Sequence, residues 1–221
     1  MKTRPQRFSA LFALVCVCLT GVSCSSKGKD ISAGGGAKRI VSLAPSLTET
    51  LFALGCGDRV VGVTDFCSYP PEAAELPRVG GYIDPNYEAL VRLEPDLVVL
   101  LKEHRPVRTF LARAGIRALP VDNHDLEAIL GSFHALAVPC GAEAAAESLT
   151  ALVRAQIVPV DAGRTRPSVL VCIDRAEVGS NTISRVVAAG PGSFYSDLVD
   201  AAGGTNAIHT TRSAYPTLSQ E

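Results

Sequence analysis

Residues 39–63 read RIVSLAPSLTETLFALGCGDRVVGV, and their pattern indicates the fold class. It opens with a short β-branched run, closes with a second one, and has a helical pattern between them. The helix is expected to start at Ser46, because Ser46 and Glu49 match the Ser-x-x-Glu capping box, and to stop at Gly55. A strand, a helix and a second strand in this order predict a βαβ unit with parallel strands.

The same alternation of short apolar runs and helical patterns continues along the chain, which predicts an α/β protein with parallel-rich sheets. Further helices are expected to begin near Asn86, Pro106 and Asp125, and a longer helical pattern runs from Ala142 to Ile157. The face expected to pack on this longer helix consists of Leu149, Leu152, Val153 and Gln156. The expected strands are Arg39–Leu43, Arg59–Val63, Leu97–Leu101, Arg117–Val121 and Ser168–Ile173. Four strands, a long helix and a new strand predict two α/β lobes joined by one helix.

The N-terminus has the pattern of an export signal. Three basic residues precede an uncharged apolar run at residues 8–22, which predicts a signal peptide over residues 1–23. This run is shorter than the roughly 20 apolar residues that span a bilayer. The letters LTGVSC that end at Cys24 resemble a lipobox, so we expect lipidation of Cys24; the alternative is a cleaved, soluble periplasmic protein. Residues 24–37 are rich in Gly, Ser and Ala and predict a flexible tether.

Charge and cysteine usage narrow the functional classes. A formal net charge of −1 and a pI near 6.4 argue against a nucleic-acid partner, which requires a concentrated basic face. Cys56, Cys67, Cys140 and Cys172 contain no C-x-x-C pair, so no zinc site is expected. An exported compartment permits a disulfide between Cys56 and Cys67, but we expect buried free thiols.

Several stretches of the chain carry a family resemblance. Residues 39–73 and 76–99 (LPRVGGYIDPNYEALVRLEPDLVV) resemble the opening of the periplasmic binding proteins for cobalamin, haem and iron-siderophores. Residues 190–194 (GPGSF), 197–208 (DLVDAAGGTNAI) and 215–221 (YPTLSQE) resemble the C-terminal lobe of the same family, in the same order. The resemblance covers nearly all of the chain after residue 37.

This resemblance implies a monomeric solute-binding component of an ABC importer, with no catalytic activity and no resident cofactor. Such a protein works in the periplasm or outside the cytoplasmic membrane and delivers cobalamin, haem or a ferric siderophore to a permease dimer with its ATPase. Family members continue beyond Glu221, so we expect an incomplete second lobe. The expected organisation is a signal peptide (1–23), a tether (24–37), an N-terminal lobe (38–140), a connecting backbone helix (141–166) and a C-terminal lobe (167–221).

The resemblance also implies roles for individual residues. Glu49 and Glu221 match the carboxylates that the family presents to permease arginines, although Glu49 has the capping box as an alternative role. Phe66, Tyr82 and Tyr215 match the aromatic residues that line the ligand cleft. The cobalamin-binding members favour Trp at two of these positions and this chain has no Trp, which leaves haem or a siderophore open as the ligand.

His104 follows an expected parallel strand, where α/β proteins bind ligands, so it is a further candidate for the cleft. Two other classes of protein remain as alternatives. One is an α/β enzyme, against which the glycines at 34–36 precede a strand instead of following one, and no nucleophile elbow is present. The other is a surface lipoprotein of the same fold without a transport role.

Overall fold

The computed structural model describes residues 36–160, 165–176, 184–211 and 213–219. The predicted signal peptide, Cys24 and Glu221 lie outside the described residues, as does nearly all of the predicted tether.

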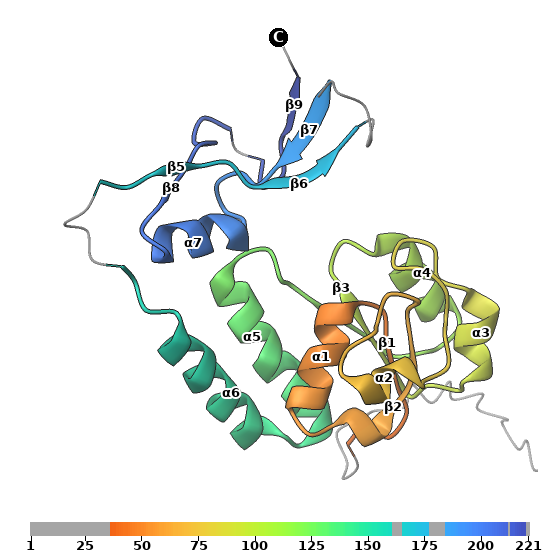
Figure 1. Cartoon of the computed structure of the whole chain (residues 1–221). Helices are drawn as coiled ribbons and strands as arrows, with labels where there is room; N and C mark the ends of the chain where they lie inside the picture. Colours follow the sequence, from red (N-terminus) through yellow and green to blue (C-terminus); the bar gives the residue numbers. More distant parts are fainter. Residues whose placement is uncertain (1–35, 161–164, 177–183, 212, 220–221) are drawn as a thin grey trace, which may run out of the picture. The chain divides into compact units, whose positions relative to one another are not determined.

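A parallel sheet of four strands forms the centre of the N-terminal region (Figure 1). The strands are β1 (Ile40–Ser42), β2 (Val60–Val63), β3 (Leu97–Leu101) and β4 (Ala118–Val121), in the order β2-β1-β3-β4. The four predicted strands of this region are confirmed, with ends that differ by at most one residue. Arg59 belongs instead to a short 3-10 turn, η1 (Gly57–Arg59), that leads into β2.

Helix α1 (Pro45–Ala53) begins one residue before the predicted start, and the predicted capping box is wrong. Pro45 occupies the first helical turn, where its missing N–H costs nothing, and Ala44 is the N-cap without a side-chain hydrogen bond. Gly55 ends the helix as predicted, with a positive φ of 74°. The Gly55 and Cys56 N–H groups donate to the carbonyls of Phe52 and Leu51, which is a Schellman motif.

The other helices of this region are capped largely as the sequence predicts. The Asn86 side chain accepts a hydrogen bond from the Ala89 N–H at the start of α3 (Tyr87–Arg92), and Asp125 accepts one from Ala128 at the start of α5 (Leu126–Ala137). Helix α4 (Arg105–Arg113) has Pro106 in its first turn. The short helices are α2 (Pro71–Ala74) and the 3-10 helix η2 (Val138–Cys140).

The predicted long helix is α6 (Glu143–Gln156), but its packed face differs from the prediction. Leu149 and Val153 pack against the core together with Ala145 and Ala146, whereas Leu152 is 57% exposed. Small side chains such as Ala145 and Ala146 allow α6 to pack closely on α5. The contact between the two helices therefore follows these alanines, and Leu152 lies outside it. Gln156 is exposed for the same reason.

The core consists of two apolar layers, one on each face of the parallel sheet. Side chains alternate along each strand, so Ile40 and Leu97 belong to one layer while Val41 and Val98 belong to the other. Helices α1, α5 and α6 contribute to the first layer, and α3 and α4 contribute to the second. Both faces are therefore buried, which explains the continuous apolar sequence of β3.

The C-terminal region contains one short parallel pair and one antiparallel sheet. Strand β5 (Ser168–Val169) pairs with β8 (Thr205–Asn206), and β6 (Cys172–Arg175), β7 (Arg185–Ala188) and β9 (Thr217–Ser219) pair antiparallel. Helix α7 (Phe194–Ala201) precedes β8. The prediction of one continuous strand over Ser168–Ile173 is wrong. The chain changes partners there: the Val169 carbonyl accepts from Ala207 next to β8, and the Val171 carbonyl accepts from Ala189 next to β7.

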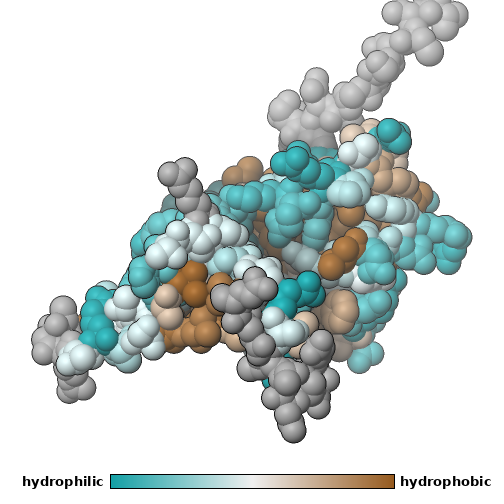
Figure 2. All heavy atoms as spheres, turned by 90° about the horizontal axis from the view of Figure 1, so that it is seen from above, coloured by the Kyte–Doolittle hydropathy of each residue, from teal (hydrophilic) through white to brown (hydrophobic). Residues whose placement is uncertain are grey.

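The cysteines of the described chain are free thiols, and Cys56, Cys67 and Cys140 are buried as expected. Cys172 is exposed, so burial was the wrong prediction for that residue. Within the same described ranges, no helix has the length and apolar character needed to cross a membrane. The face seen in Figure 2 carries brown, apolar patches between teal, hydrophilic ones.

Candidate functional site

The carboxyl ends of the parallel strands define where a site can form. In the order β2-β1-β3-β4, the chain adds β2 on one side of β1 and then β3 and β4 on the other side, so a topological switch point lies between β1 and β3. α/β proteins bind ligands in the crevice outside such a switch point. Within three residues of the strand ends lie Pro45 after β1, Phe66 after β2, and Glu103 and His104 after β3. Three separate loops therefore supply side chains to one edge of the sheet.

A hollow of about 440 Å³ lies at this edge. It is lined by Pro45, Phe66, Tyr82, Ile83 and Asp84. Phe66 is 66% exposed and Ile83 is 84% exposed, although both are large apolar side chains. Water-exposed apolar groups that gather around a concave surface are typical of a ligand site, because a ligand recovers the free energy that their exposure costs.

The loop that presents Tyr82 is held by its backbone. The Gly80 carbonyl accepts a 2.9 Å hydrogen bond from Asp65 N–H, which ties this loop to the one that carries Phe66. Gly80 has a φ of 87°, and a Cβ atom there would lie 2.7 Å from the Asn86 nitrogen. Glycine is therefore required at position 80. The hydrogen bond between the two loops in turn holds Phe66 and Tyr82 near each other.

Tyr82 connects the hollow to the end of β3. Its hydroxyl donates a 3.1 Å hydrogen bond to the Glu103 carboxylate, and its ring packs edge-on against the ring of His104 with centroids 4.4 Å apart. Burial, reinforced by the charge of Glu103 and this hydrogen bond, raises the pKa of Tyr82 to about 12. Tyr82 therefore holds its proton at neutral pH.

His104 is buried beside Tyr82, with 8% of its surface exposed. Neither ring nitrogen has a hydrogen-bond partner within the described residues. Burial lowers the pKa of His104, and the nearby Glu103 carboxylate opposes this shift. The imidazole is therefore neutral at pH 7 and has unused hydrogen-bonding and metal-binding capacity.

The third predicted aromatic residue, Tyr215, does not line the hollow. It is 40% exposed and lies close enough for its phenol to raise the pKa of Tyr82. Burial raises the pKa of Tyr215 itself, and Tyr195 and Glu103 add to this shift. The structure thus brings Phe66 and Tyr82 together in one surface, with His104 behind Tyr82 and Tyr215 in the electrostatic surroundings.

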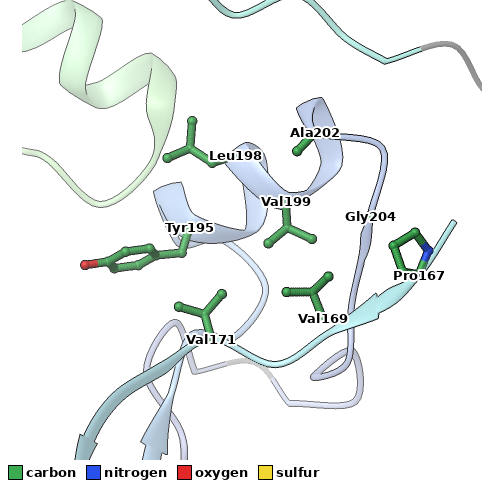
Figure 3. A pocket seen from close by; sticks show the side chains of 8 residues that line it. All are labelled: Pro167, Val169, Val171, Tyr195, Leu198, Val199, Ala202 and Gly204. Atoms are coloured by element: carbon green, nitrogen blue, oxygen red, sulfur yellow. The ribbon is translucent and has the colours of Figure 1, made fainter.

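A second hollow of about 280 Å³ lies in the C-terminal region, between α7 and β5 (Figure 3). The Val169, Val171 and Val199 side chains face one another there, and the Tyr195 hydroxyl points away from them. Its lining residues are Pro167, Val169, Val171, Tyr195, Leu198, Val199, Ala202 and Gly204. It offers apolar surface without a charged group, so the hollow at Tyr82 is the better candidate for specific recognition.

The predicted docking carboxylate Glu49 lies on the outer side of α1. It is exposed, and Ser46 and Ala53 are exposed on the same helix. The N-cap of α1 has no side-chain hydrogen bond, so Glu49 takes no part in a capping box. The carboxylate is free of the competing structural role that the sequence suggested.

Sequence reasoning missed Glu103, Asp84, Pro45 and Ile83 as members of the site. The rule that pointed to His104, namely its place after a parallel strand, applies equally to Glu103 and would have found it. Pro45 precedes the predicted helix start at Ser46, and no sequence pattern marks it as part of a cavity wall. Ile83 resembles an ordinary core residue until its exposure is known.

Comparison with known proteins extends these observations. A family model for periplasmic binding proteins matches residues 40–221. The vitamin B12-binding protein of Salmonella paratyphi A is 31% identical over 191 residues, which cover 84% of this chain and 68% of that protein. The vitamin B12-binding protein of Vibrio cholerae serotype O1 is 36% identical over 102 residues, so the match spans 37% of that relative's length.

Solved structures show the same fold. The periplasmic haem-binding protein from Roseiflexus sp. RS-1 superposes with a TM-score of 0.68 at 30% identity, over 83% of this chain and 71% of that chain. The periplasmic vitamin B12 binding protein of Vibrio cholerae gives a TM-score of 0.66 at 25% identity, over 85% and 72% of the two chains. The family match over residues 40–221 and the overlap with the Salmonella protein show that this chain belongs to the periplasmic binding protein family.

Proposed function

We propose that this chain is the solute-binding component of an ABC importer and captures a corrinoid at the hollow formed by Phe66 and Tyr82. Haem or an iron chelate is the alternative ligand. The observation that carries the proposal is a pair of aromatic rings, Phe66 exposed and Tyr82 half-buried, that line one hollow at the carboxyl edge of a parallel sheet. Family membership supports ligand binding and transport in place of catalysis.

The size of the aromatic surface suits a planar macrocycle. Two rings that each cover about 100 Å² would contribute about 5 kcal/mol at about 25 cal/mol/Å². Association itself costs a comparable amount, so further contacts are required. Tyr215 and the exposed Ile83 are available to supply them.

The state of Tyr82 favours a corrinoid over haem. Haem iron is held in proteins by His, Cys, Met or Tyr, and a tyrosine ligand acts through its deprotonated oxygen. Burial, reinforced by Glu103, keeps the proton on Tyr82, which opposes that role and favours a ligand that packs against the ring. The neutral His104 keeps the haem alternative open, since an imidazole can also bind iron.

Delivery to the permease would use Glu49. Its exposure on α1 supports a docking role, and we propose that Glu221 provides the equivalent carboxylate on the C-terminal lobe. Such exposed ion pairs are worth about 0–1 kcal/mol each, so they would orient a complex that must dissociate again. We further propose that the mature protein is a monomer outside the cytoplasmic membrane, held there by a lipid on Cys24.

A binding titration tests the ligand class. The purified chain would be titrated with cyanocobalamin, haemin and a ferric hydroxamate, following ligand absorbance and the fluorescence of its five tyrosines, since it contains no Trp. Saturable one-to-one binding of cyanocobalamin is expected. Tighter binding of haemin or the hydroxamate would replace the corrinoid by that ligand, and a folded sample that binds none of the three would contradict the proposed function.

A further inference from the structure

The charge around the hollow is negative. Asp84 lines it directly, and Glu103 accepts the hydrogen bond of Tyr82, whose ring forms part of the wall. Glu103 is exposed, and the 3.1 Å hydrogen bond holds its carboxylate next to the Tyr82 hydroxyl, at the margin of the hollow. Two carboxylates therefore stand beside an otherwise apolar surface.

Three basic side chains near Glu103 and Asp84 in the sequence are engaged elsewhere. Lys102 pairs with Asp122, and Arg108 donates to the Lys102 carbonyl. Arg78 donates to the backbone carbonyls of Thr64 and Cys67 at 2.8 Å. In the part of the chain that the structure describes, Glu103 forms no ion pair, either with the neighbouring Arg105 or with another basic side chain. Among the described residues, Glu103 and Asp84 therefore carry their charges without an ion-pair partner.

An uncompensated carboxylate discriminates between macrocycles by the groups on their rim. A primary amide donates N–H groups, and a hydrogen bond to an ionised carboxylate is about twice as strong as one between neutral groups. A rim carboxylate instead meets a like charge in a site from which the ligand displaces water. Cobalamin carries amides around its corrin ring, whereas haem carries two propionates.

We infer that Glu103 is a specificity-determining residue, which selects macrocycles with an amide rim and rejects those with a carboxylate rim. This inference rests on the proposed function, because it concerns the same hollow and the same class of ligand. Glu103 thus does more than accept the hydrogen bond of Tyr82. This hydrogen bond holds the carboxylate beside the hollow, and the negative charge of the carboxylate discriminates between ligands.

Two corrinoids with the same ring isolate the effect of rim charge. Dicyanocobinamide carries amides, and dicyanocobyrinic acid carries carboxylates at the corresponding positions. Each would be titrated into the wild-type chain, into Glu103→Gln, and into Glu147→Gln as a matched control on the exposed surface of α6. Thermal unfolding would confirm that all three proteins are folded.

The wild-type chain and Glu147→Gln should bind the amide corrinoid at least about tenfold more tightly than the carboxylate corrinoid, and Glu103→Gln should lose most of this preference. A preference that is unchanged in Glu103→Gln, with both ligands still bound, would overturn the role of Glu103 and leave the proposed function intact. Failure of the folded wild-type chain to bind either corrinoid would overturn the corrinoid function itself, and this inference with it.

Discussion

The ring of His104 stands edge-on to the ring of Tyr82, with centroids 4.4 Å apart and an interplanar angle of 71°. The imidazole packs behind the Tyr82 ring and is buried, with 8% of His104 exposed. A buried imidazole without a hydrogen-bond partner is stable only in its neutral form, because no acceptor is present to offset the loss of hydration on protonation.

Acid should therefore destabilise the protein through His104. Its folded pKa lies below the ordinary value of about 6.5, so its contribution to stability is complete above that value and is lost as the pH falls through the folded pKa. Urea unfolding between about pH 7 and about pH 5 should show a decline that His104→Phe reduces, since Phe keeps the ring and cannot be protonated. An identical pH dependence in the two proteins would show that His104 is accessible to water.

Glu49→Ala should leave the fold and ligand binding unchanged. Because Glu49 does not cap α1, its loss should change the free energy of unfolding by less than about 0.5 kcal/mol, whereas loss of a cap would cost about 1 kcal/mol. Association with the permease should weaken by up to about fivefold and depend on salt, as expected for an exposed ion pair. Ser46→Ala, on the same helix, is the control; a stability loss shared by both variants would restore the capping box.

The four strands and the longer helices of the N-terminal region could be predicted because each has a local signal. Strand β3 is apolar throughout, and Asn86, Asp125 and Gly55 occupy the cap positions that their side chains or backbones favour. The start of α1 was missed because two local signals compete there. Pro45 is suited to the first helical turn, so the helix begins there and Ala44 becomes the N-cap. Ser46 then lies inside the helix, where its side chain cannot form a capping box with Glu49.

Truncation of Leu152 tests which face of α6 packs on the core, with Leu136 of α5 as a buried reference. Leu136 is fully buried, so Leu136→Ala should lower the free energy of unfolding by about 2–5 kcal/mol. Leu152→Ala should change it by less than about 0.5 kcal/mol, because the side chain is 57% exposed. Denaturant titration of both variants measures the difference, and a comparable loss in Leu152→Ala would support the face that the sequence predicted.

The site was less predictable than the sheet, because a site depends on contacts between loops that are distant in the sequence. Phe66 and Tyr82 could be named from the resemblance, and the hydrogen bond between Asp65 and Gly80 explains how they meet. The place of Glu103 after β3 points to the edge of the sheet, but its hydrogen bond to Tyr82, 21 residues away, depends on the tertiary structure. Likewise, the partner change between β5 and β6 depends on long-range pairing and not on local propensity.

The most direct test of the account is removal of the aromatic surface. Cyanocobalamin would be titrated into the wild-type chain, into Phe66→Ala/Tyr82→Ala, and into Val91→Ala, a control at an exposed apolar residue of α3. The double variant should stay folded and bind at least about a hundredfold more weakly, because the area that the two rings bury is lost, while Val91→Ala should bind as the wild type does. Unchanged binding by the double variant would contradict the account and place the ligand elsewhere on the protein.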